Sequence, residues 1–295
     1  MSVANKKSPY DLRQSPLFRL RKKTELADLL QLTCSQLVEL TSADDLYSEW
    51  DQRKGNGKIR RIESPENRLA QVQKRIEKVL SRVVLPGFLY CPVKGKSYVN
   101  NARQHLEGIE VRCLDVADYF TSTPSRRVFW FFDSVMECSH DVAGILTSLA
   151  TYKGHLPTGS PLSPLMSFYA HYDMWLSIWD LAKAAGCIIT VYMDDVTISG
   201  PRVPDRLIWE IKKKISRNGL RYHKERSFAG GHACEVTGVV LDRGELKLPH
   251  RQHKKMHELR REIRVTPKVA EIEILNRKLL GRIAQANQIA RENIK

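Results

Sequence analysis

The sequence has 295 residues, 42% of them hydrophobic and 27% charged, which describes a globular chain with a sizeable core and excludes an intrinsically disordered one. No apolar run approaches the roughly 20 residues of a membrane span, and the N-terminus lacks the apolar core of a secretory signal, so we expect a cytoplasmic protein with no membrane partner. The formal net charge of +15 predicts a polyanionic partner instead.

The positive charge is concentrated near the C-terminus. From His250 to Lys295 the chain carries 12 Lys and Arg residues against 5 Glu, so nearly half of the surplus lies in the last sixth of the sequence. A concentration of this kind favours nucleic acid as the partner. The six cysteines include no Cys-x-x-Cys pair, so a zinc site is not indicated.

The N-terminal part of the chain predicts helices followed by a hairpin. Leucines recur at helical spacing over residues 10–48, where Thr33 is placed to cap a second helix and Thr41-Ser42 to cap a further turn. An Asn-Gly turn signal inside residues 47–65 then predicts two antiparallel strands. Residues 66–85 carry apolar side chains at helical spacing and predict an amphipathic helix.

The middle of the chain alternates between loops, helices and one acidic strand. We expect a loop over 86–96, a helix that carries Asn101 to His105, and an apolar strand from Glu110 that ends near Asp115. Residues 125–137 and 140–152 predict two helices. A loop rich in Gly and Pro, Leu156 to Pro164, leads into a helix over Ser163 to Ala184.

Two adjacent carboxylates interrupt the next apolar strand. Asp194 and Asp195 follow Cys187 to Tyr192, and burying either acid unpaired would cost several kcal/mol. A turn at Met193 and Asp194 would resolve this conflict by placing the acids at the tip of a hairpin. If Asp115 lies on a neighbouring strand, the three carboxylates form a cluster that can hold two metal ions roughly 3.5–4 Å apart.

The C-terminal part predicts a mixed region followed by helices. Residues 204–218 predict an amphipathic helix, and Phe228 to Leu248 predict two strands. After Pro249 we expect three helices, namely His250 to Arg264, Lys268 to Leu280, and Gly281 to Ile294.

Five ordered motifs between about residue 50 and residue 240 together resemble the retron-type bacterial reverse transcriptases. The general polymerase motifs are Leu114 to Phe120, Leu156 to Leu165, and Tyr192 to Asp195. Two further elements are typical of retron enzymes, the Asn-Ala-x-x-His element at Asn101 to His105 and the Val-Thr-Gly element at Val236 to Gly238. Any one of these motifs is weak by itself, but their order and spacing are specific.

The resemblance implies an α+β fold of the right-hand polymerase class, with fingers, a palm built on an antiparallel sheet, and a helical thumb. We predict an N-terminal helical extension at 1–48, fingers at 49–107, a palm at 108–249 with a fingers insertion near 140–160, and a thumb at 250–295.

The resemblance also implies an RNA-directed DNA polymerase, a nucleotidyltransferase that uses dNTP substrates and two Mg²⁺ ions. Asp115, Asp194 and Asp195 would be the catalytic residues and would hold the ions, with help from the backbone of Val116. The predicted nucleotide-binding residues are Lys58, Arg61, Asp118, Tyr119, Phe120, Gly159 and Lys224. The predicted RNA-binding residues are Asn101, His105, Arg251, Lys254, Lys255, Arg261, Arg277, Lys278 and Arg282.

Some of these residues have more specific implied roles. Arg61 matches the triphosphate-contacting position of the family better than Lys58, and its fork suits phosphate oxygens. Phe120 matches the aromatic that excludes ribonucleotides, Gly159 lets the backbone approach the nascent base pair, and Lys224 would lie near the leaving pyrophosphate. Thr158 stands where many reverse transcriptases have Gln, so no role is assigned to it. For His105 we expect a structural or template-RNA role.

The resemblance to retron enzymes also implies a particular template, priming site and product. The enzyme folds with its own structured noncoding RNA, primes from an internal guanosine 2′-hydroxyl, and copies part of the RNA into a branched multicopy DNA. Such systems act in anti-phage defence together with an effector protein.

Two alternatives remain open at this point. A group II intron-like reverse transcriptase would usually carry Gln in the third motif and a DNA-binding or endonuclease tail, and the chain ends at Lys295 without one. A non-catalytic RNA-binding scaffold of the same fold would not need the intact set Asp115, Asp194 and Asp195.

Overall fold

The computed structural model describes residues 8–43, 45–53, 57, 59–230 and 232–294, and it divides into two compact units that each draw on three segments of the chain. Unit 1 comprises Met1–Gly87, Val116–Ile178 and Lys212–Tyr222; unit 2 comprises Phe88–Asp115, Trp179–Ile211 and His223–Lys295. Within the described part of the chain, none of the helices combines the length and apolar character that a bilayer crossing requires. The four-part division predicted above stays a prediction.

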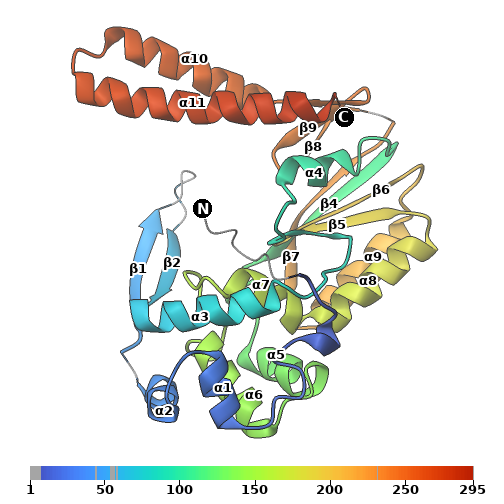
Figure 1. The fold of residues 1–295 in the computed structure, drawn as a ribbon. Coiled ribbons are helices and arrows are strands. Elements are labelled where there is room, and N and C mark those ends of the chain that lie inside the picture. The colour runs from blue at the N-terminus through green and yellow to red at the C-terminus, as the bar shows by residue number, and fades with distance from the viewer. Residues whose placement is uncertain (1–7, 44, 54–56, 58, 231, 295) are drawn as a thin grey trace. The chain divides into compact units, whose positions relative to one another are not determined.

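Unit 1 is mainly helical and contains one two-stranded hairpin (Figure 1). The strands β1 (Tyr47–Arg53) and β2 (Ile59–Pro65) pair antiparallel in register from Tyr47 opposite Pro65, which confirms the predicted hairpin. Its helices include η1 (Leu12–Gln14), α1 (Lys23–Leu29), α2 (Cys34–Ser42), α3 (Asn67–Leu80), α5 (Ser125–Trp130), the π-helix η2 (Phe131–Val135), α6 (His140–Ala150) and α7 (Ser163–Ala170). Two more helices, α8 (Tyr172–Ala184) and α9 (Asp205–Arg217), each contribute residues to both units.

The helices of unit 1 follow from local sequence. Thr33 caps α2 as predicted, because its hydroxyl accepts from the Gln36 N–H while the Gln36 side chain accepts from the Thr33 N–H. In α3, Leu69, Val72 and Ile76 fall at helical spacing and are buried, so one face of this helix joins the core.

Unit 2 is built on a five-stranded sheet with the order β3-β5-β6-β4-β7. The strands are β3 (Leu89–Cys91), β4 (Glu110–Ala117), β5 (Ile188–Tyr192), β6 (Asp195–Gly200) and β7 (Arg221–Phe228), with the ends of β4 and β7 reaching into unit 1. The β4–β6 and β5–β6 pairs are antiparallel, whereas β3 and β5 are parallel.

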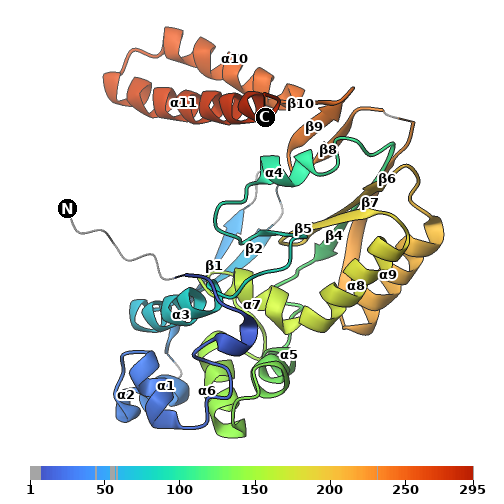
Figure 2. The ribbon, with the colours of Figure 1, turned by 45° about the vertical axis from the view of Figure 1, so that its right-hand side comes forward.

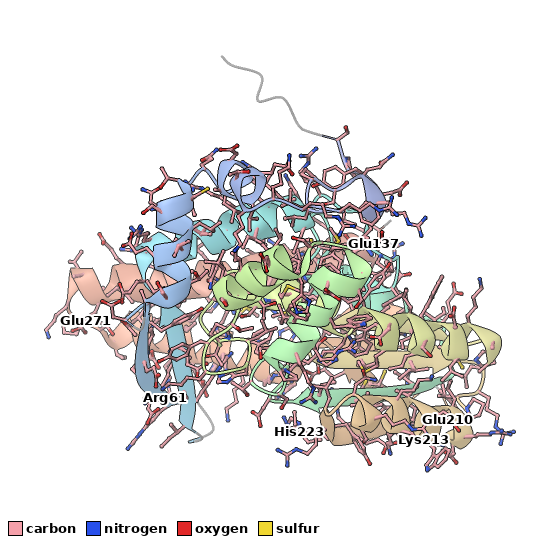
Figure 3. All side chains as sticks on the ribbon, turned by 90° about the horizontal axis from the view of Figure 1, so that it is seen from below. Arg61, Glu137, Glu210, Lys213, His223 and Glu271 are labelled. Carbon is pink, nitrogen blue, oxygen red and sulfur yellow. The ribbon has the colours of Figure 1, made fainter. Side chains whose placement is uncertain are left out.

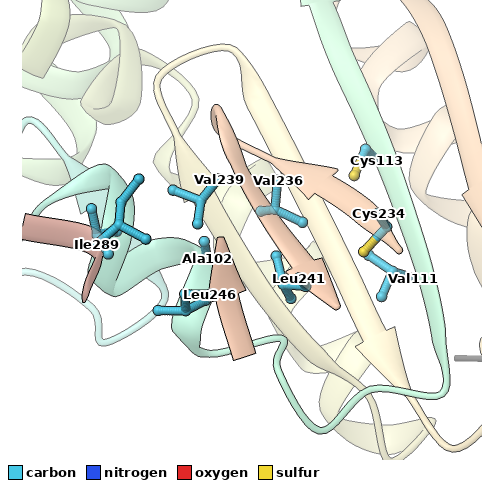
Figure 4. Packing of buried hydrophobic residues seen from close by; sticks show 10 residues of the cluster. Ala102, Val111, Cys113, Cys234, Val236, Val239, Leu241, Leu246 and Ile289 are labelled. Atoms are coloured by element: carbon cyan, nitrogen blue, oxygen red, sulfur yellow. The ribbon is translucent and has the colours of Figure 1, made fainter. Parts of the chain in front are cut away.

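A second sheet and the C-terminal helices complete unit 2. The antiparallel strands β8 (Cys234–Val236), β9 (Val239–Asp242) and β10 (Glu245–Lys247) lie beside α4 (Tyr98–Arg103) and the end of α11 (Val269–Glu292), which packs along α10 (His250–Val265) (Figure 2). Val236, Val239 and Leu241 from this sheet share a buried core with Val111 and Cys113 of β4 (Figure 4).

Several predicted boundaries in the first half of the chain are wrong. The helix α2 continues through Ser42, so Thr41-Ser42 caps no further turn. The expected loop 86–96 contains β3, because its residues pair with β5. The helix predicted over 125–137 widens into the π-helix η2, and the helix predicted over Ser163 to Ala184 is broken at His171, which is fully buried.

Two corrections concern the C-terminal part. The region 228–248 holds three short strands after β7 instead of two, because Thr237 and Gly238 adopt positive φ angles of 45° and 85° and form a turn between β8 and β9. The predicted thumb has two helices instead of three. Gly281 lies inside α11 without breaking it, since packing against α10 outweighs its low helix propensity of about 1 kcal/mol.

Candidate active site

The acidic pair lies at a two-residue hairpin turn. Because β5 ends at Tyr192 and β6 begins at Asp195, and these two residues are Cα partners, Met193 and Asp194 form the turn. Met193 adopts a φ of +61°, a left-handed conformation that tight hairpin turns require. The turn predicted from the sequence is confirmed, and it explains how two acids interrupt an otherwise apolar pair of strands.

Asp115 lies directly opposite Asp195. The two are Cα partners in the antiparallel β4–β6 ladder, and directly opposite residues of such a pair project their side chains to the same face of the sheet. The structure thus brings Asp115 close to an acidic pair that lies about 80 residues later in the sequence. All three acids belong to unit 2.

The electrostatics of this face disfavour three free negative charges. Burial and, to a smaller extent, the neighbouring charges of Asp194 and Asp115 together raise the pKa of Asp195 to about 6. Arg226 and Lys224 act in the opposite direction, with smaller effects on this pKa. A cation close to such a carboxyl group would favour the carboxylate form and lower this pKa.

Two basic side chains of β7 lie close to Asp115. The Nζ atom of Lys224 lies 3.3 Å from Asp115 Oδ2, and the Nε2 atom of His223 lies 3.6 Å from the same oxygen. Figure 3 shows His223 among the side chains of this edge strand. The structure therefore places Lys224 at Asp115, and its predicted role near the leaving pyrophosphate stays a prediction. Sequence reasoning did not single out His223, although it is the neighbour of Lys224 in the sequence.

The three acids do not form a preformed metal-binding site. Among the described residues, no group of three or more His, Cys, Asp or Glu side chains is arranged to hold a metal ion, so the predicted three-carboxylate cluster is not preformed. At Asp115, Oδ2 faces Lys224 and His223. The other oxygen, Oδ1, is buried and has no hydrogen-bond partner.

The donor set nevertheless fits a divalent ion. A buried carboxylate oxygen that lacks a partner, next to a second carboxyl group with a raised pKa, is a place where a hard cation would satisfy both groups. The side chain of Val116 is buried in the core, so only its backbone could take part, as expected.

The two retron-type elements contact each other inside unit 2. The Asn101 side chain donates to Thr237 Oγ1 at 3.3 Å, and the Thr237 hydroxyl donates to the Tyr98 carbonyl at 3.0 Å. His105 is fully buried between two hydroxyls, with Nδ1 2.7 Å from Ser199 Oγ and Nε2 2.7 Å from Thr190 Oγ1. These contacts join α4 and the turn after it to the two sheets.

The prediction that Asn101 and His105 bind RNA is wrong, and the structural role considered for His105 is supported. Asn101 is 1% exposed and His105 is not exposed, so neither side chain can reach a ligand at the surface. Burial lowers the pKa of His105 to about 3, which keeps the imidazole neutral. The partners Ser199, Thr190 and Thr237 are distant in sequence, and only Thr237 belonged to a recognised motif.

The remaining nucleotide-binding predictions fall in unit 1, except for Lys58, which lies outside the described residues. Asp118 is exposed with a φ of +47°, and Phe120 is partly buried. Tyr119 is a core residue: its hydroxyl donates to the Ser167 carbonyl at 2.9 Å and accepts from Trp175 Nε1 at 2.8 Å. A contact of its side chain with nucleotide is therefore excluded in this structure, because the ring and the hydroxyl are already engaged.

Arg61 and Gly159 have protein partners in unit 1. The Arg61 guanidinium pairs with Glu49 and Asp51 of the same hairpin. A Cβ atom at Gly159 would lie 2.7 Å from the carbonyl oxygen of Glu63, so this glycine is needed for the close approach to β2. The predicted close approach of this backbone to the nascent base pair stays a prediction.

The predicted RNA-binding cations of the C-terminal helices differ in their surroundings. Arg251 forms an ion pair with Glu235, Arg277 lies 3.8 Å from Glu273, and Arg282 donates to Gln252. Arg282 is half-buried, and the other members are exposed; of these, Lys254, Lys255, Arg261 and Lys278 are the ones not named in these contacts. Exposed cations remain accessible to an external phosphate, whereas an internal partner competes for Arg251 and Arg282.

The fold defined by this sheet and its acidic hairpin is that of a reverse transcriptase. A foamy viral protease–reverse transcriptase, solved in complex with double-stranded DNA, aligns with 95% of this chain at a TM-score of 0.50 and 14% sequence identity, over 44% of its own length. This likeness confirms the predicted α+β fold of the right-hand polymerase class.

Curated relatives narrow the resemblance to retron reverse transcriptases. The chain is 28% identical to the retron Se72 reverse transcriptase of Salmonella heidelberg over 65% of its length, 26% identical to the retron Ec86 enzyme of Escherichia coli over 70%, and 27% identical to the retron Mx162 enzyme of Myxococcus xanthus over 78%. The predicted resemblance to retron-type reverse transcriptases is thereby confirmed. No family model matches the chain. The chain spans 54%, 66% and 55% of the lengths of these relatives.

Proposed function

We propose that this protein is an RNA-directed DNA polymerase of the retron type that adds deoxynucleotides to a primer on an RNA template. The observation that carries the proposal is the register of β4 and β6, which sets Asp115 opposite Asp195 beside the Asp194 turn. Acidic side chains on adjacent strand ends, with a lysine at hydrogen-bond distance, suit phosphoryl transfer better than a passive RNA-binding role.

Each side chain of the site has a chemical task in this proposal. Asp115, Asp194 and Asp195 would hold two Mg²⁺ ions, which would supply activation of the primer hydroxyl and charge neutralisation at the triphosphate. Asp115 Oδ1 is the first oxygen available to an ion, because it is buried without a partner. Lys224 lies 3.3 Å from Asp115 Oδ2, where it balances the negative charge, and it would turn to the pyrophosphate once an ion takes over that task.

The template and product that we propose are those of a retron. The names of the relatives, which are retron reverse transcriptases, support the retron assignment alone. From the family resemblance we further propose a structured noncoding RNA that is partly copied into branched DNA from an internal 2′-hydroxyl, within an anti-phage system that includes an effector protein. The exposed cations of α10 and α11 suit the phosphates of the RNA. The proposed compartment is the cytoplasm, where this RNA and the dNTPs are present.

The enzyme assignment is tested by single-turnover incorporation of labelled dNTP. Asp194→Asn should reduce incorporation by at least about 10³-fold, since loss of a metal-holding carboxylate removes transition-state stabilisation. The matched control is Asp205→Asn, which removes an aspartate whose side chain is 88% exposed and pairs with Arg112. Equal incorporation by the wild type and Asp194→Asn would refute the assignment.

The retron assignment is tested separately by sequencing the nucleic acid that co-purifies with the protein. A branched RNA–DNA molecule joined through a 2′-linkage is the expected result. Random cellular RNA in its place would contradict the retron programme while leaving the polymerase activity to the first experiment.

A further inference from the structure

The loop that carries the third polymerase motif borders the free edge of β2. Alternate residues of an antiparallel strand turn their N–H and C=O groups toward the partner strand or away from it. Arg61 and Glu63, two residues apart, both turn these groups away from β1 and toward Thr158. The Thr158 hydroxyl donates to the Arg61 carbonyl at 2.9 Å and accepts from the Glu63 N–H at 3.0 Å.

Two neighbours of Thr158 reinforce this contact at Glu63. The Gly159 N–H donates to the Glu63 carbonyl at 2.9 Å, an approach that leaves no room for a Cβ atom. Glu63 is only 6% exposed, and its side chain lies 3.0 Å from His155 Nε2. The loop is therefore fixed to the strand at consecutive points, and Thr158 is the point that contacts Arg61.

The same loop also holds the side-chain partner of Arg61. The Arg61 Nη2 and Nε atoms lie 2.6 and 3.2 Å from Glu49 Oε2, and Nη1 lies 3.2 Å from Asp51 Oδ1. Glu49 in turn accepts from the Tyr152 hydroxyl and from Lys153 Nζ, each at 2.5 Å. Figure 3 shows Arg61 on this hairpin.

This arrangement leaves Arg61 oriented but still able to bind an anion. A guanidinium has five N–H donors, and the pairs with Glu49 and Asp51 leave one hydrogen free on each Nη atom. Phosphate recognition by such a fork depends steeply on the position of its main chain, because hydrogen bonds weaken within a few tenths of an ångström.

Resting on the proposed function, we propose that Thr158 is a positioning residue for the incoming nucleotide. Its hydroxyl fixes the main chain of β2 at Arg61, and through Arg61 it sets the affinity for the triphosphate of a dNTP. Thr158 performs this task by bonding to the backbone, without touching the nucleotide itself. The proposal thus gives a role to the residue that stands where many reverse transcriptases have Gln.

The test compares Thr158→Val, which keeps the shape and removes the hydroxyl, with Thr158→Ser, which keeps the hydroxyl. Steady-state incorporation on a fixed template–primer should show the KM for dNTP raised about fivefold in Thr158→Val with kcat within about twofold, as expected for loss of one hydrogen bond. Thr158→Ser should stay within about twofold of the wild type in both constants.

A double-mutant cycle with Arg61→Ala shows whether Thr158 acts through Arg61. In the Arg61→Ala background, Thr158→Val should change the KM by less than about twofold, because the group that it positions is gone. A fivefold effect that persists in this background would overturn the proposal and indicate a direct contact of Thr158 with nucleotide. An unchanged KM in Thr158→Val alone would overturn it as well.

Hydrogen exchange at the Glu63 amide separates this inference from the proposed function, since it needs no substrate. The exchange should accelerate in Thr158→Val and not in Thr158→Ser, because the Glu63 N–H is bonded to the Thr158 hydroxyl. If the exchange rate of the Glu63 amide is unchanged in Thr158→Val, the positioning role is refuted even when the protein is an active polymerase. A wild-type protein that incorporates no dNTP would instead refute the proposed function.

Discussion

At the scale of single residues, the electrostatic cost of the acidic site is concentrated in one carboxyl group. The folded-state pKa of Asp195, about 6, lies above its ordinary value of 3.8 because of burial and then the charges of Asp194 and Asp115. The folded protein therefore binds more protons than the unfolded chain between these two values. The contribution of Asp195 to the free energy of unfolding therefore rises as the pH falls through this window and is lowest above it.

We predict that Asp195→Asn raises the melting temperature by about 2–6 °C at pH 7.5 in a buffer with EDTA, since it removes a buried negative charge. The gain should shrink as the pH is lowered from 6 toward 4, where the wild-type carboxyl is protonated. Differential scanning fluorimetry across this range measures both effects. Asp205→Asn, at an exposed position, should show no such gain.

The same residues predict how the protein responds to a divalent ion. Because an ion that binds only the folded state stabilises it by mass action, Mg²⁺ in the millimolar range should raise the melting temperature of the wild type. Asp115→Asn should lose most of this increase, since it removes the carboxylate whose Oδ1 is buried without a partner. An equal increase in both proteins would place the ion elsewhere.

His105 shows that a polar residue of a signature element can belong to the core. We predict that His105→Ala lowers the free energy of unfolding by about 2–4 kcal/mol, because it leaves a cavity and two unpaired hydroxyls at Ser199 and Thr190. Chemical denaturation at pH 7.5 measures this loss, and at a temperature where the variant is folded its affinity for RNA should match that of the wild type.

The sign of the pH dependence follows from the pKa of His105. Since the folded value of about 3 lies below the ordinary value of 6.5, its contribution to stability is fully present above pH 6.5 and is lost as the pH falls toward 3. The wild type should therefore lose stability on acidification more steeply than His105→Ala. Equal pH slopes in the two proteins would contradict the assignment of a buried neutral imidazole.

At the scale of elements, two glycines of unit 2 should respond in opposite directions to the same substitution. Gly238 has a φ of +85° in the β8–β9 turn, whereas Gly281 lies in the middle of α11, and a Cβ atom at either would meet no atom within 4 Å. Gly238→Ala should destabilise by about 1–2 kcal/mol through backbone strain alone. Gly281→Ala should stabilise by about 0.5–1 kcal/mol through helix propensity. Urea unfolding of both variants compares the two signs directly.

Elements with strong local signals could be predicted from the sequence. The capping box at Thr33, the hairpin of β1 and β2, and the Met193-Asp194 turn all depend on residues close together in the chain. The paired apolar strands also predicted that Asp115 and Asp195 would meet, because both acids stand at the ends of strands that need a partner.

The parts that could not be predicted depend on contacts between distant segments. Asn101 and His105 are buried against hydrogen-bond partners that lie 85 to 136 residues away in the sequence. From the sequence alone, a polar side chain is expected to be exposed at the surface. The uninterrupted helix through Gly281 depends in the same way on packing against α10. The proposed role of Thr158 depends likewise on hydrogen bonds between its hydroxyl and the distant backbone of β2.

At the scale of the whole molecule, the net charge of +15 predicts strong and salt-dependent binding to RNA. Each cation that neutralises a phosphate releases counterions, so the logarithm of the affinity should fall linearly with the logarithm of the salt concentration. The slope of this line is proportional to the number of phosphates that the protein neutralises. It therefore distinguishes cations that reach the RNA from cations that are occupied within the protein.

The C-terminal helices allow this distinction to be tested. Lys254→Gln and Arg261→Gln remove exposed cations of α10, and together they should lower the salt slope by about 1–2 for a structured RNA, as expected for two lost phosphate contacts. Arg251→Gln removes one cation of the same helix that is already paired with Glu235, so it should change the slope by less than about 0.5. Filter binding between about 50 and 200 mM salt measures the slopes. If Arg251→Gln lowers the slope as much per charge as the exposed pair, the ion pair with Glu235 opens on RNA binding and all three cations contact the RNA.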